Sequence, residues 1–263
     1  MDIDREMLQD VVQAVREAGE LILAAWDKPR NIRHKGRIDL VTDIDLAVEN
    51  ELKNSLGEVL PQADFLAEES AGEKSLGHGP TWIVDPLDGT TNFAHKIPFV
   101  AVSVGLWEAG LVRLGVIYLP VLGEMYQAAQ GRGAFLNNEQ IRVTSTGDLE
   151  QALVATGFPY TIRTNVDEVL DYMRRALMSA RGVRRCGSAA TDMAYTAAGR
   201  YDAFFEIGLK PWDTAAGACL ISEAGGRVST IDGSDYVPGQ RDVLGSNAKL
   251  HELMTRMLTG SKE

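Results

Sequence analysis

Apolar residues recur at helical spacing in the first part of the chain. The positions that share one face are Met7, Leu8, Val11, Val12, Val15, Ala18, Leu21, Ile22 and Ala25. This spacing predicts an amphipathic helix over residues 4–26, which ends before Pro29 because proline cannot continue a helix. A second helix is predicted over residues 43–55.

The middle of the chain changes to apolar or alternating runs separated by Gly, Pro and Asp turns. Strands are predicted over residues 81–84, 98–106, 111–119 and 124–129. Glu108-Ala109-Gly110 and Gly131-Arg132-Gly133 each lie between two apolar runs, which is typical of hairpin loops. This part is therefore expected to form a sheet.

After Leu149 helices and strands alternate again. A strand is predicted over residues 152–156 and helices over 166–180, 188–198 and 212–224, with short strands between them. The chain contains no internal repeat and no low-complexity linker. We therefore expect one compact α/β unit of two lobes, residues 1–150 and 151–263, that share a cleft across a soft boundary.

Composition narrows the class of protein. With 26 Lys and Arg against 37 Asp and Glu, the net charge of -11 argues against direct binding to the phosphate backbone of nucleic acid. The two cysteines, Cys186 and Cys219, are too few for a disulfide scaffold and are expected to be buried thiols. The acidic N-terminus is unlike a secretion signal, and the longest apolar stretch is too short to span a bilayer. We expect a cytoplasmic protein without membrane contact.

The most informative segment is the run WIVDPLDGTTNF at residues 82–93. An apolar strand leads into Asp85 and Asp88, and a Pro/Gly turn then opens into hydroxyl and amide residues. Two carboxylates and the intervening Leu87 carbonyl can bind hard divalent cations, and the amides after Gly89 can face an anion. The alternative interpretation is a plain turn, since Asp, Pro and Gly favour turns for conformational reasons alone.

Three further acidic clusters also lie at the ends of predicted elements. They are Glu68-Glu69 after an apolar run, Asp43 with Asp45, and Asp213 at the start of a helix. Taken singly, each is explained as a solvated or capping acid. That explanation leaves open why one chain carries four such clusters around apolar strands.

The blocks at residues 64–70, 82–93 and 210–217 resemble the three signature blocks of the inositol monophosphatase family of magnesium-dependent phosphatases. The similarity extends to Lys35-Gly36, to 39–45, to Gly187-Ser188-Ala189-Ala190 and to 224–226, so it spans nearly the whole chain in order. Ala67 and Thr191 depart from residues common in the family. Neither stands at a position that the resemblance makes a ligand.

The resemblance implies a layered αβαβα sugar-phosphatase fold, a magnesium-dependent phosphatase activity and a metal-binding site. By position, the expected ligands of two or three Mg²⁺ ions are Glu68, Asp85, the Leu87 carbonyl, Asp88 and Asp213. Asp45 and Thr90, with Glu68 nearby, would orient or deprotonate the attacking water. Substrate contacts are expected from Leu87, Asp88, Gly89, Thr90, Thr91, Arg184, Gly187, Ser188, Ala189, Glu206 and Asp213, and from Lys35 on a mobile loop. Such a site needs no histidine, so His34, His78, His95 and His251 are expected to be surface or packing residues.

The family resemblance leaves the substrate open. The segment around Glu206 is most similar to the inositol-specific branch, which implies hydrolysis of inositol 1-phosphate. Fructose 1,6-bisphosphate, 3'-phosphoadenosine 5'-phosphate, histidinol phosphate and NADP are the alternatives. Glu206 would then face ring hydroxyls, unless it is a solvated acid at a strand end.

A non-enzymatic role is also open. The basic run at residues 181–185 is either a solvated strand edge or a contact for an anionic substrate or a neighbouring subunit. The family resemblance implies a homodimer, and some bacterial members act in transcription antitermination by binding RNA polymerase components. A metal-binding fold without turnover is a third alternative, which the presence of Asp45 and Thr90 disfavours.

Overall fold

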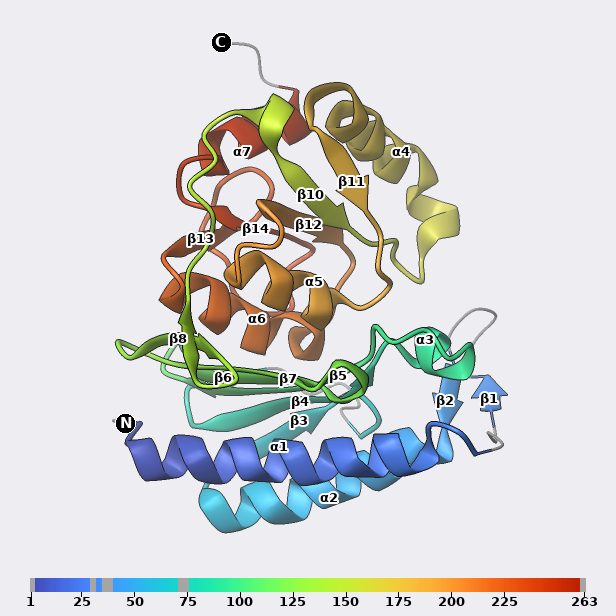
Figure 1. Cartoon of the computed structure of the whole chain (residues 1–263), viewed down its shortest axis with the longest axis vertical. Helices are drawn as coiled ribbons and strands as arrows, with labels where there is room; N and C mark the ends of the chain where they lie inside the picture. The colour runs from blue at the N-terminus through green and yellow to red at the C-terminus, as the bar shows by residue number, and fades with distance from the viewer. Residues whose placement is uncertain (1–2, 29–31, 35–39, 71–75, 261–263) are drawn as a thin grey trace.

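The computed structural model describes residues 3–28, 32–34, 40–70 and 76–260, and it is built in five layers (Figure 1). Helices α1 (Arg5–Ala25) and α2 (Asp43–Val59) cover one face of a seven-stranded sheet. Helices α5 (Ala189–Ala197) and α6 (Pro211–Glu223) lie between that sheet and a five-stranded one. Helices α4 (Ile162–Ser179) and α7 (His251–Thr259) form the outer layer. The αβαβα architecture expected from the sequence is confirmed.

The seven-stranded sheet has its strands in order along the chain, β3 to β9, and all neighbours are antiparallel except the parallel pair β3 and β4. Its strands are β3 (Asp64–Ala67), β4 (Thr81–Asp88), β5 (Ala101–Glu108), β6 (Leu111–Leu119), β7 (Glu124–Ala129), β8 (Gly133–Leu136) and β9 (Glu139–Ile141). Ala109 and Gly110 both have positive φ in the predicted hairpin between β5 and β6, as a two-residue turn requires.

The five-stranded sheet has the order β11-β10-β12-β14-β13, so its connections cross over. Its strands are β10 (Leu153–Thr156), β11 (Gly182–Arg184), β12 (Ala203–Ile207), β13 (Gly226–Ser229) and β14 (Asp242–Asn247). The basic run thus contributes the edge strand β11, as the strand-edge interpretation predicts. A separate antiparallel pair joins β1 (Ile32–His34) to β2 (Leu40–Thr42).

The predicted helices are present, with small differences at their ends. Helix α1 begins after Asp4, whose side chain accepts a hydrogen bond from the Met7 amide at 2.8 Å. Helix α4 begins at Ile162, four residues earlier than the apolar pattern indicated, because its first turn is polar. The short helix α3 (Thr90–Ala94) was not predicted, because five residues are too few for a periodic signal.

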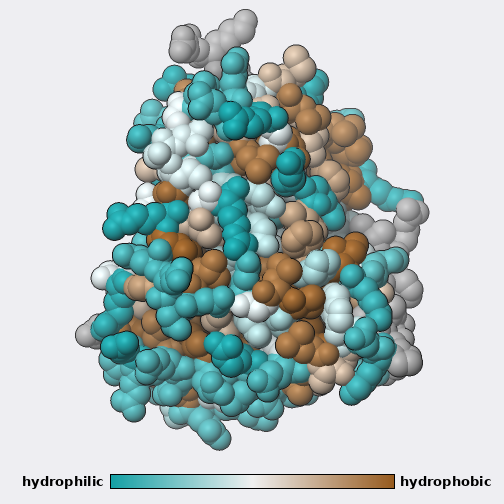
Figure 2. Space-filling view, in the orientation of Figure 1, coloured by the Kyte–Doolittle hydropathy of each residue, from teal (hydrophilic) through white to brown (hydrophobic). Residues whose placement is uncertain are grey.

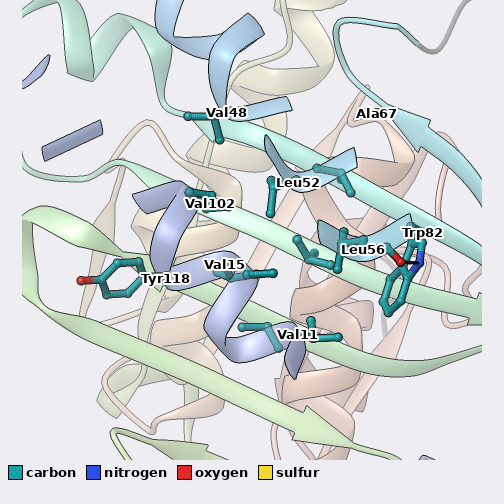
Figure 3. Packing of buried hydrophobic residues seen from close by; sticks show 14 of the residues in the cluster. Val11, Val15, Val48, Leu52, Leu56, Ala67, Trp82, Val102 and Tyr118 are labelled. Atoms are coloured by element: carbon teal, nitrogen blue, oxygen red, sulfur yellow. Dashed lines mark hydrogen bonds between the residues drawn. The ribbon is translucent and has the colours of Figure 1, made fainter. Parts of the chain in front are cut away.

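One apolar core joins the N-terminal helices to the seven-stranded sheet (Figure 3). Val11 and Val15 of α1 and Leu52 of α2 are fully buried over β4 and β5. Trp82 of β4 is buried among them and donates its indole N–H to the Leu56 carbonyl at 3.1 Å. This core fixes β4, whose C-terminal end carries the acidic pair Asp85 and Asp88.

A second core lies between the sheets and brings α6 against β5 and β6. Gly115 allows this close approach, because a Cβ there would lie 2.5 Å from the Ala216 carbonyl oxygen. The packing places the N-terminus of α6 near the end of β4. In the described residues no helix is long and apolar enough to cross a membrane.

The two cysteines differ in their surroundings. Cys219 is buried, as expected, whereas Cys186 is half-buried and its sulfur lies 3.2 Å from the Tyr201 hydroxyl. Burial raises the pKa of the Cys186 thiol to about 11, so it is not a reactive thiolate at neutral pH.

Candidate active site

The acidic pair lies where the β4 ladder becomes irregular. Pairing with β5 shifts register between Asp85 and Asp88, a bulge-like irregularity after which Asp88 pairs with Ala101 at the end of the strand. Asp85 is 2% exposed, and its Oδ1 accepts a hydrogen bond from the Leu87 amide at 3.0 Å. Gly89 follows with φ of 92°, a left-handed conformation that suits glycine, and opens α3.

A pocket of about 530 Å³ lies at this turn, between the two sheets' ends. Most of the residues expected from the sequence line it together: Glu68, Asp85, Leu87, Asp88, Gly89, Thr90, Thr91, Gly187, Ser188, Ala189, Glu206 and Asp213. They come from β4, α3, α5, β12, α6 and the segment after β3. The sequence blocks, up to 145 positions apart between Glu68 and Asp213, therefore meet at one site.

Three expected residues stand apart from this lining. Asp45, in the first turn of α2, is fully buried behind the pocket and reaches it through Thr90. Arg184, the last residue of β11, is exposed and does not line the pocket. Lys35 lies outside the described residues.

Thr90 connects Asp45 to the pocket. Its Oγ1 lies 3.2 Å from Asp45 Oδ1 and 3.2 Å from the Leu87 carbonyl oxygen, so its single proton has two acceptors. Thr90 is itself 7% exposed and lines the pocket. A water in the pocket can therefore donate to Thr90 Oγ1 while Thr90 donates to the buried carboxylate.

Asp88 is held by residues at the start of α5. Its Oδ2 accepts hydrogen bonds from Ser188 Oγ at 2.7 Å and from the Ala190 amide at 2.6 Å, both at the start of α5. Burial raises the pKa of Asp88 to about 6, although these hydrogen bonds favour the ionised form and lower it. The carboxylate is thus fixed in direction and stays ionised at neutral pH.

The other acids of the pocket repel one another. Burial raises the pKa of Asp85, and the charges of Glu68, Asp88 and Asp213 raise it further. Asp213, in the first turn of α6, has its pKa raised by burial and by Asp88, while its Oδ2 accepts from the Lys210 amide at 2.6 Å. Clustered buried carboxylates with raised pKa values are typical of functional sites.

The donor chemistry of this cluster fits a hard divalent cation. Four carboxylates and the Leu87 carbonyl offer only oxygen ligands, which Mg²⁺ prefers, and a cation would offset their mutual repulsion. Among the described residues no group of three acidic, histidine or cysteine side chains is already arranged around one ion. One oxygen each of Asp85, Asp88 and Asp213 is bound instead to a donor of the chain.

Glu206 lines the same pocket as the acidic pair. It is 7% exposed on β12, which excludes the interpretation of a solvated acid at a strand end. Its pKa is raised by burial first and then by Asp213, Asp192 and Asp88. Gly157 leaves room for it, because a Cβ at that position would collide with the Glu206 carboxylate.

Several pocket residues were missed by sequence reasoning. Asn92 donates from Nδ2 to the carbonyls of Phe99 at 2.7 Å and Cys186 at 2.9 Å, which joins the segment after α3 to the segment before α5 at the pocket. Its place in the 82–93 run was the only signal. Arg185 belongs to the basic run that the sequence singles out, whereas nothing local in the sequence distinguishes other lining residues, among them Phe158, Tyr160, Asp192 and Trp212.

His78 and His95 are exposed and His251 is buried, whereas the side chain of His34 lies outside the described residues. Within the described lining no histidine is present. His251 is 1% exposed at the start of α7, where its two ring nitrogens each lie 2.7 Å from a serine hydroxyl, Ser229 and Ser246. It is a packing residue of the five-stranded sheet.

Comparisons with known proteins identify the family of the chain. The family model described as "Inositol monophosphatase family" matches residues 4–263. Inositol monophosphatase 2 of Solanum lycopersicum is 41% identical over 98% of this chain and 99% of its own. Nus factor SuhB of Pseudomonas aeruginosa is 40% identical over 92% of each chain. The crystal structure of extragenic suppressor protein suhB from Bartonella henselae superposes with a TM-score of 0.90 and 36% identity, over 97% of this chain and 98% of that one. With these matches over nearly its whole length, the chain belongs to the inositol monophosphatase family.

Proposed function

We propose that this chain is a Mg²⁺-dependent phosphomonoesterase that hydrolyses inositol 1-phosphate to inositol and phosphate. The observation that carries the proposal is the meeting of Glu68, Asp85, Asp88 and Asp213 in one pocket beside the pair Asp45 and Thr90. The family's phosphatase activity and general dependence on metal support it. The choice of Mg²⁺ rests on the all-oxygen donor set.

Each group of residues has a distinct task in this reaction. Bound Mg²⁺ would supply Lewis-acid stabilisation of the phosphoryl oxygens and lower the pKa of a bound water. Glu68, Asp85, Asp88, Asp213 and the Leu87 carbonyl would hold it. Thr90 Oγ1 accepts a hydrogen bond from the attacking water and donates its own to Asp45. These two hydrogen bonds orient the water for attack.

The substrate is placed by the rest of the lining. Gly89, Thr90 and Thr91 would contact the phosphate at the start of α3. Gly187, Ser188, Ala189 and Glu206 would contact the leaving alcohol on the opposite wall. The buried Glu206 carboxyl is an acceptor for a ring hydroxyl, which favours inositol 1-phosphate over esters without hydroxyls at that position.

The direct test is phosphate release from inositol 1-phosphate, fructose 1,6-bisphosphate, 3'-phosphoadenosine 5'-phosphate, histidinol phosphate and NADP, with and without Mg²⁺. Asp88→Asn should lower kcat by about 100-fold or more, because it removes a charge that acts on the transition state. The thermal midpoint of the variant reports whether the fold is intact. Near wild-type turnover in Asp88→Asn would contradict the ligand assignment.

The inositol preference has its own test in Glu206→Gln. This variant should change the ranking of the five esters while the Mg²⁺ concentration for half-maximal activity stays the same. If the wild-type protein prefers another ester, the proposed mechanism stands but inositol 1-phosphate is not the substrate. An unchanged ranking in Glu206→Gln would remove Glu206 from substrate selection.

We further propose a homodimer, with α4 as the contact. Its exposed side chains Val166, Leu170 and Leu177 recur at helical spacing and are 40%, 58% and 60% exposed. Figure 2 shows apolar side chains gathered over this helix at the upper right. Leu170→Glu should shift the molar mass measured by light scattering from dimer to monomer.

A second candidate function is binding to the transcription machinery. It is supported by relatives named Nus factor SuhB, such as that of Escherichia coli with 37% identity over 94% of each chain. An intact acidic site is compatible with both roles. Direct binding of the purified chain to RNA polymerase and its elongation factors, unchanged in Asp88→Asn, would separate this role from catalysis.

A further inference from the structure

Two neighbouring arginines that look equivalent in the sequence have different surroundings. Both are exposed, but Arg184 ends the edge strand β11 and does not line the pocket, whereas Arg185 begins the segment that leads to α5 and lines it. The guanidinium carbon of Arg185 lies 5.1 Å from the centre of the Phe158 ring, which also lines the pocket. This stacking holds the cation against the wall of the site.

The backbone beneath Arg185 is shaped to admit it. A Cβ on Gly187 would lie 2.8 Å from Arg185 Nη1, so the guanidinium packs directly over this glycine. Gly187 has φ of 85°, which a side chain would also disfavour. Gly187 is next to Ser188, the residue that holds Asp88, so Arg185 lies near the Ser188 side of the acidic cluster.

Two carboxyl groups that can accept hydrogen bonds lie near the Arg185 guanidinium. Glu206 and Asp192 both line the pocket and are 7% and 1% exposed. Burial raises the pKa of each, and the nearby charge of Arg185 lowers both. Asp192 Oδ1 has no hydrogen-bond partner in the described part of the chain. The wall therefore combines a fixed fork of N–H donors with buried carboxyl oxygens.

We propose that Arg185 is a specificity-determining residue, which donates hydrogen bonds to the hydroxyl oxygens of a polyhydroxylated leaving group while Glu206 accepts from its hydroxyl protons. A guanidinium only donates and a carboxyl oxygen accepts, whereas a hydroxyl does both and satisfies the two together. A flat aryl leaving group satisfies neither. Sites built to bind hydroxyls discriminate strongly against analogues that lack them, because their own polar groups are left unpaired.

This inference rests on the proposed phosphatase function, and the test separates the two. The measured quantity is the ratio of kcat/KM for inositol 1-phosphate to kcat/KM for p-nitrophenyl phosphate. Arg185→Gln should lower this ratio by about 10- to 100-fold, through a higher KM for the inositol ester. Its kcat/KM on the aryl ester should stay within about twofold, because the acidic cluster is untouched.

Arg184→Gln is the matched control, since it removes the same charge one position away and outside the pocket. It should leave the ratio unchanged. Arg185→Lys keeps the charge but loses the planar fork, and its ratio should lie between those of wild type and Arg185→Gln. Thermal midpoints within about 1 °C would show that none of the variants unfolds the pocket, as expected for exposed side chains.

An unchanged ratio in Arg185→Gln, or an equal loss on both esters, would overturn the proposal. An equal effect of Arg184→Gln would also overturn it, because only net charge would then matter. Failure of the phosphatase function gives a different pattern: wild type would release phosphate from neither ester, and Asp88→Asn would change nothing.

Discussion

Ser188 Oγ donates a hydrogen bond of 2.7 Å to Asp88 Oδ2, across 100 positions of sequence. The donor caps α5 and the acceptor ends β4, so the contact ties the middle helix layer to the acidic end of the large sheet. Asp88 is thereby directed before any ligand binds.

Loss of this contact should weaken metal binding. In Ser188→Ala, Asp88 keeps the Ala190 amide but loses the hydroxyl, so its pKa should rise above about 6 and its direction should loosen. We expect the Mg²⁺ concentration for half-maximal activity to rise by about 10-fold. Activity should also rise with pH over a higher range than in wild type. An unchanged Mg²⁺ requirement would show that Ser188 only caps α5.

Thr90→Val tests the path from the pocket to Asp45. The substitution keeps the shape and removes the hydroxyl that lies between the pocket and the buried carboxylate. We expect kcat to fall by about 10²- to 10⁴-fold with little change in KM, because the lost group acts on the water and not on binding. Thr90→Ser, which retains the hydroxyl, is the control. Turnover by Thr90→Val at the rate of Thr90→Ser would rule the path out.

His251 should make the protein sensitive to acid. Burial lowers its pKa from 6.5 to about 4, so below pH 6.5 the unfolded chain binds a proton that the folded chain does not. The free energy of unfolding should therefore fall as pH falls from 6.5 to 4, by up to about 3 kcal/mol from this group. Above pH 6.5 it contributes no pH dependence.

Urea unfolding at pH 7.5, 6.0 and 4.5 measures this effect. His251→Gln retains hydrogen-bonding groups for Ser229 and Ser246 but cannot titrate, so its stability should depend less steeply on pH. Parallel curves for the two proteins would mean that other groups cause the loss.

Two leucines of α2, one buried and one exposed, test how much the core against β4 contributes to the free energy of unfolding. Leu52 of α2 is fully buried against the sheet (Figure 3), and Leu52→Ala should lower the free energy of unfolding by about 2–5 kcal/mol. Leu46 on α2 is 43% exposed, so Leu46→Ala should change it by less than about 0.5 kcal/mol. Chemical denaturation measures both. Equal losses would place Leu46 in a contact, such as an interface, that the single chain leaves open.

Local pattern predicted most of the elements. Helix α1 follows from the spacing of Val11, Val15 and Ile22, and the β5–β6 hairpin follows from Ala109-Gly110 between apolar runs. Both signals are local, since periodicity and turn chemistry act within a few residues. The pairing order β11-β10-β12-β14-β13 was not predictable in this way, because it depends on contacts between distant segments.

The candidate site likewise contains residues that the sequence indicates and relationships that only the tertiary structure shows. The carboxylates Asp85 and Asp88 and the helix-start Asp213 are visible in the sequence, because acids at the ends of apolar elements stand out and the family blocks assign them. The resemblance also pairs Asp45 with Thr90, and the fold places the buried Asp45 carboxylate 3.2 Å from Thr90 Oγ1. The division into lobes near residue 150 and the cytoplasmic location stay predictions.

Only the tertiary structure distinguished Arg185 from Arg184. The two residues share charge, size and neighbourhood along the chain, so no pattern separates them. The last residue of β11 does not line the pocket, and the next packs over Gly187 and Phe158. The sequence by itself therefore determined which chemistry this protein carries, through residue types and their local spacing. Which of these side chains meet was decided by the packing of α5 and α6 between two sheets, a long-range arrangement that no short stretch of sequence encodes.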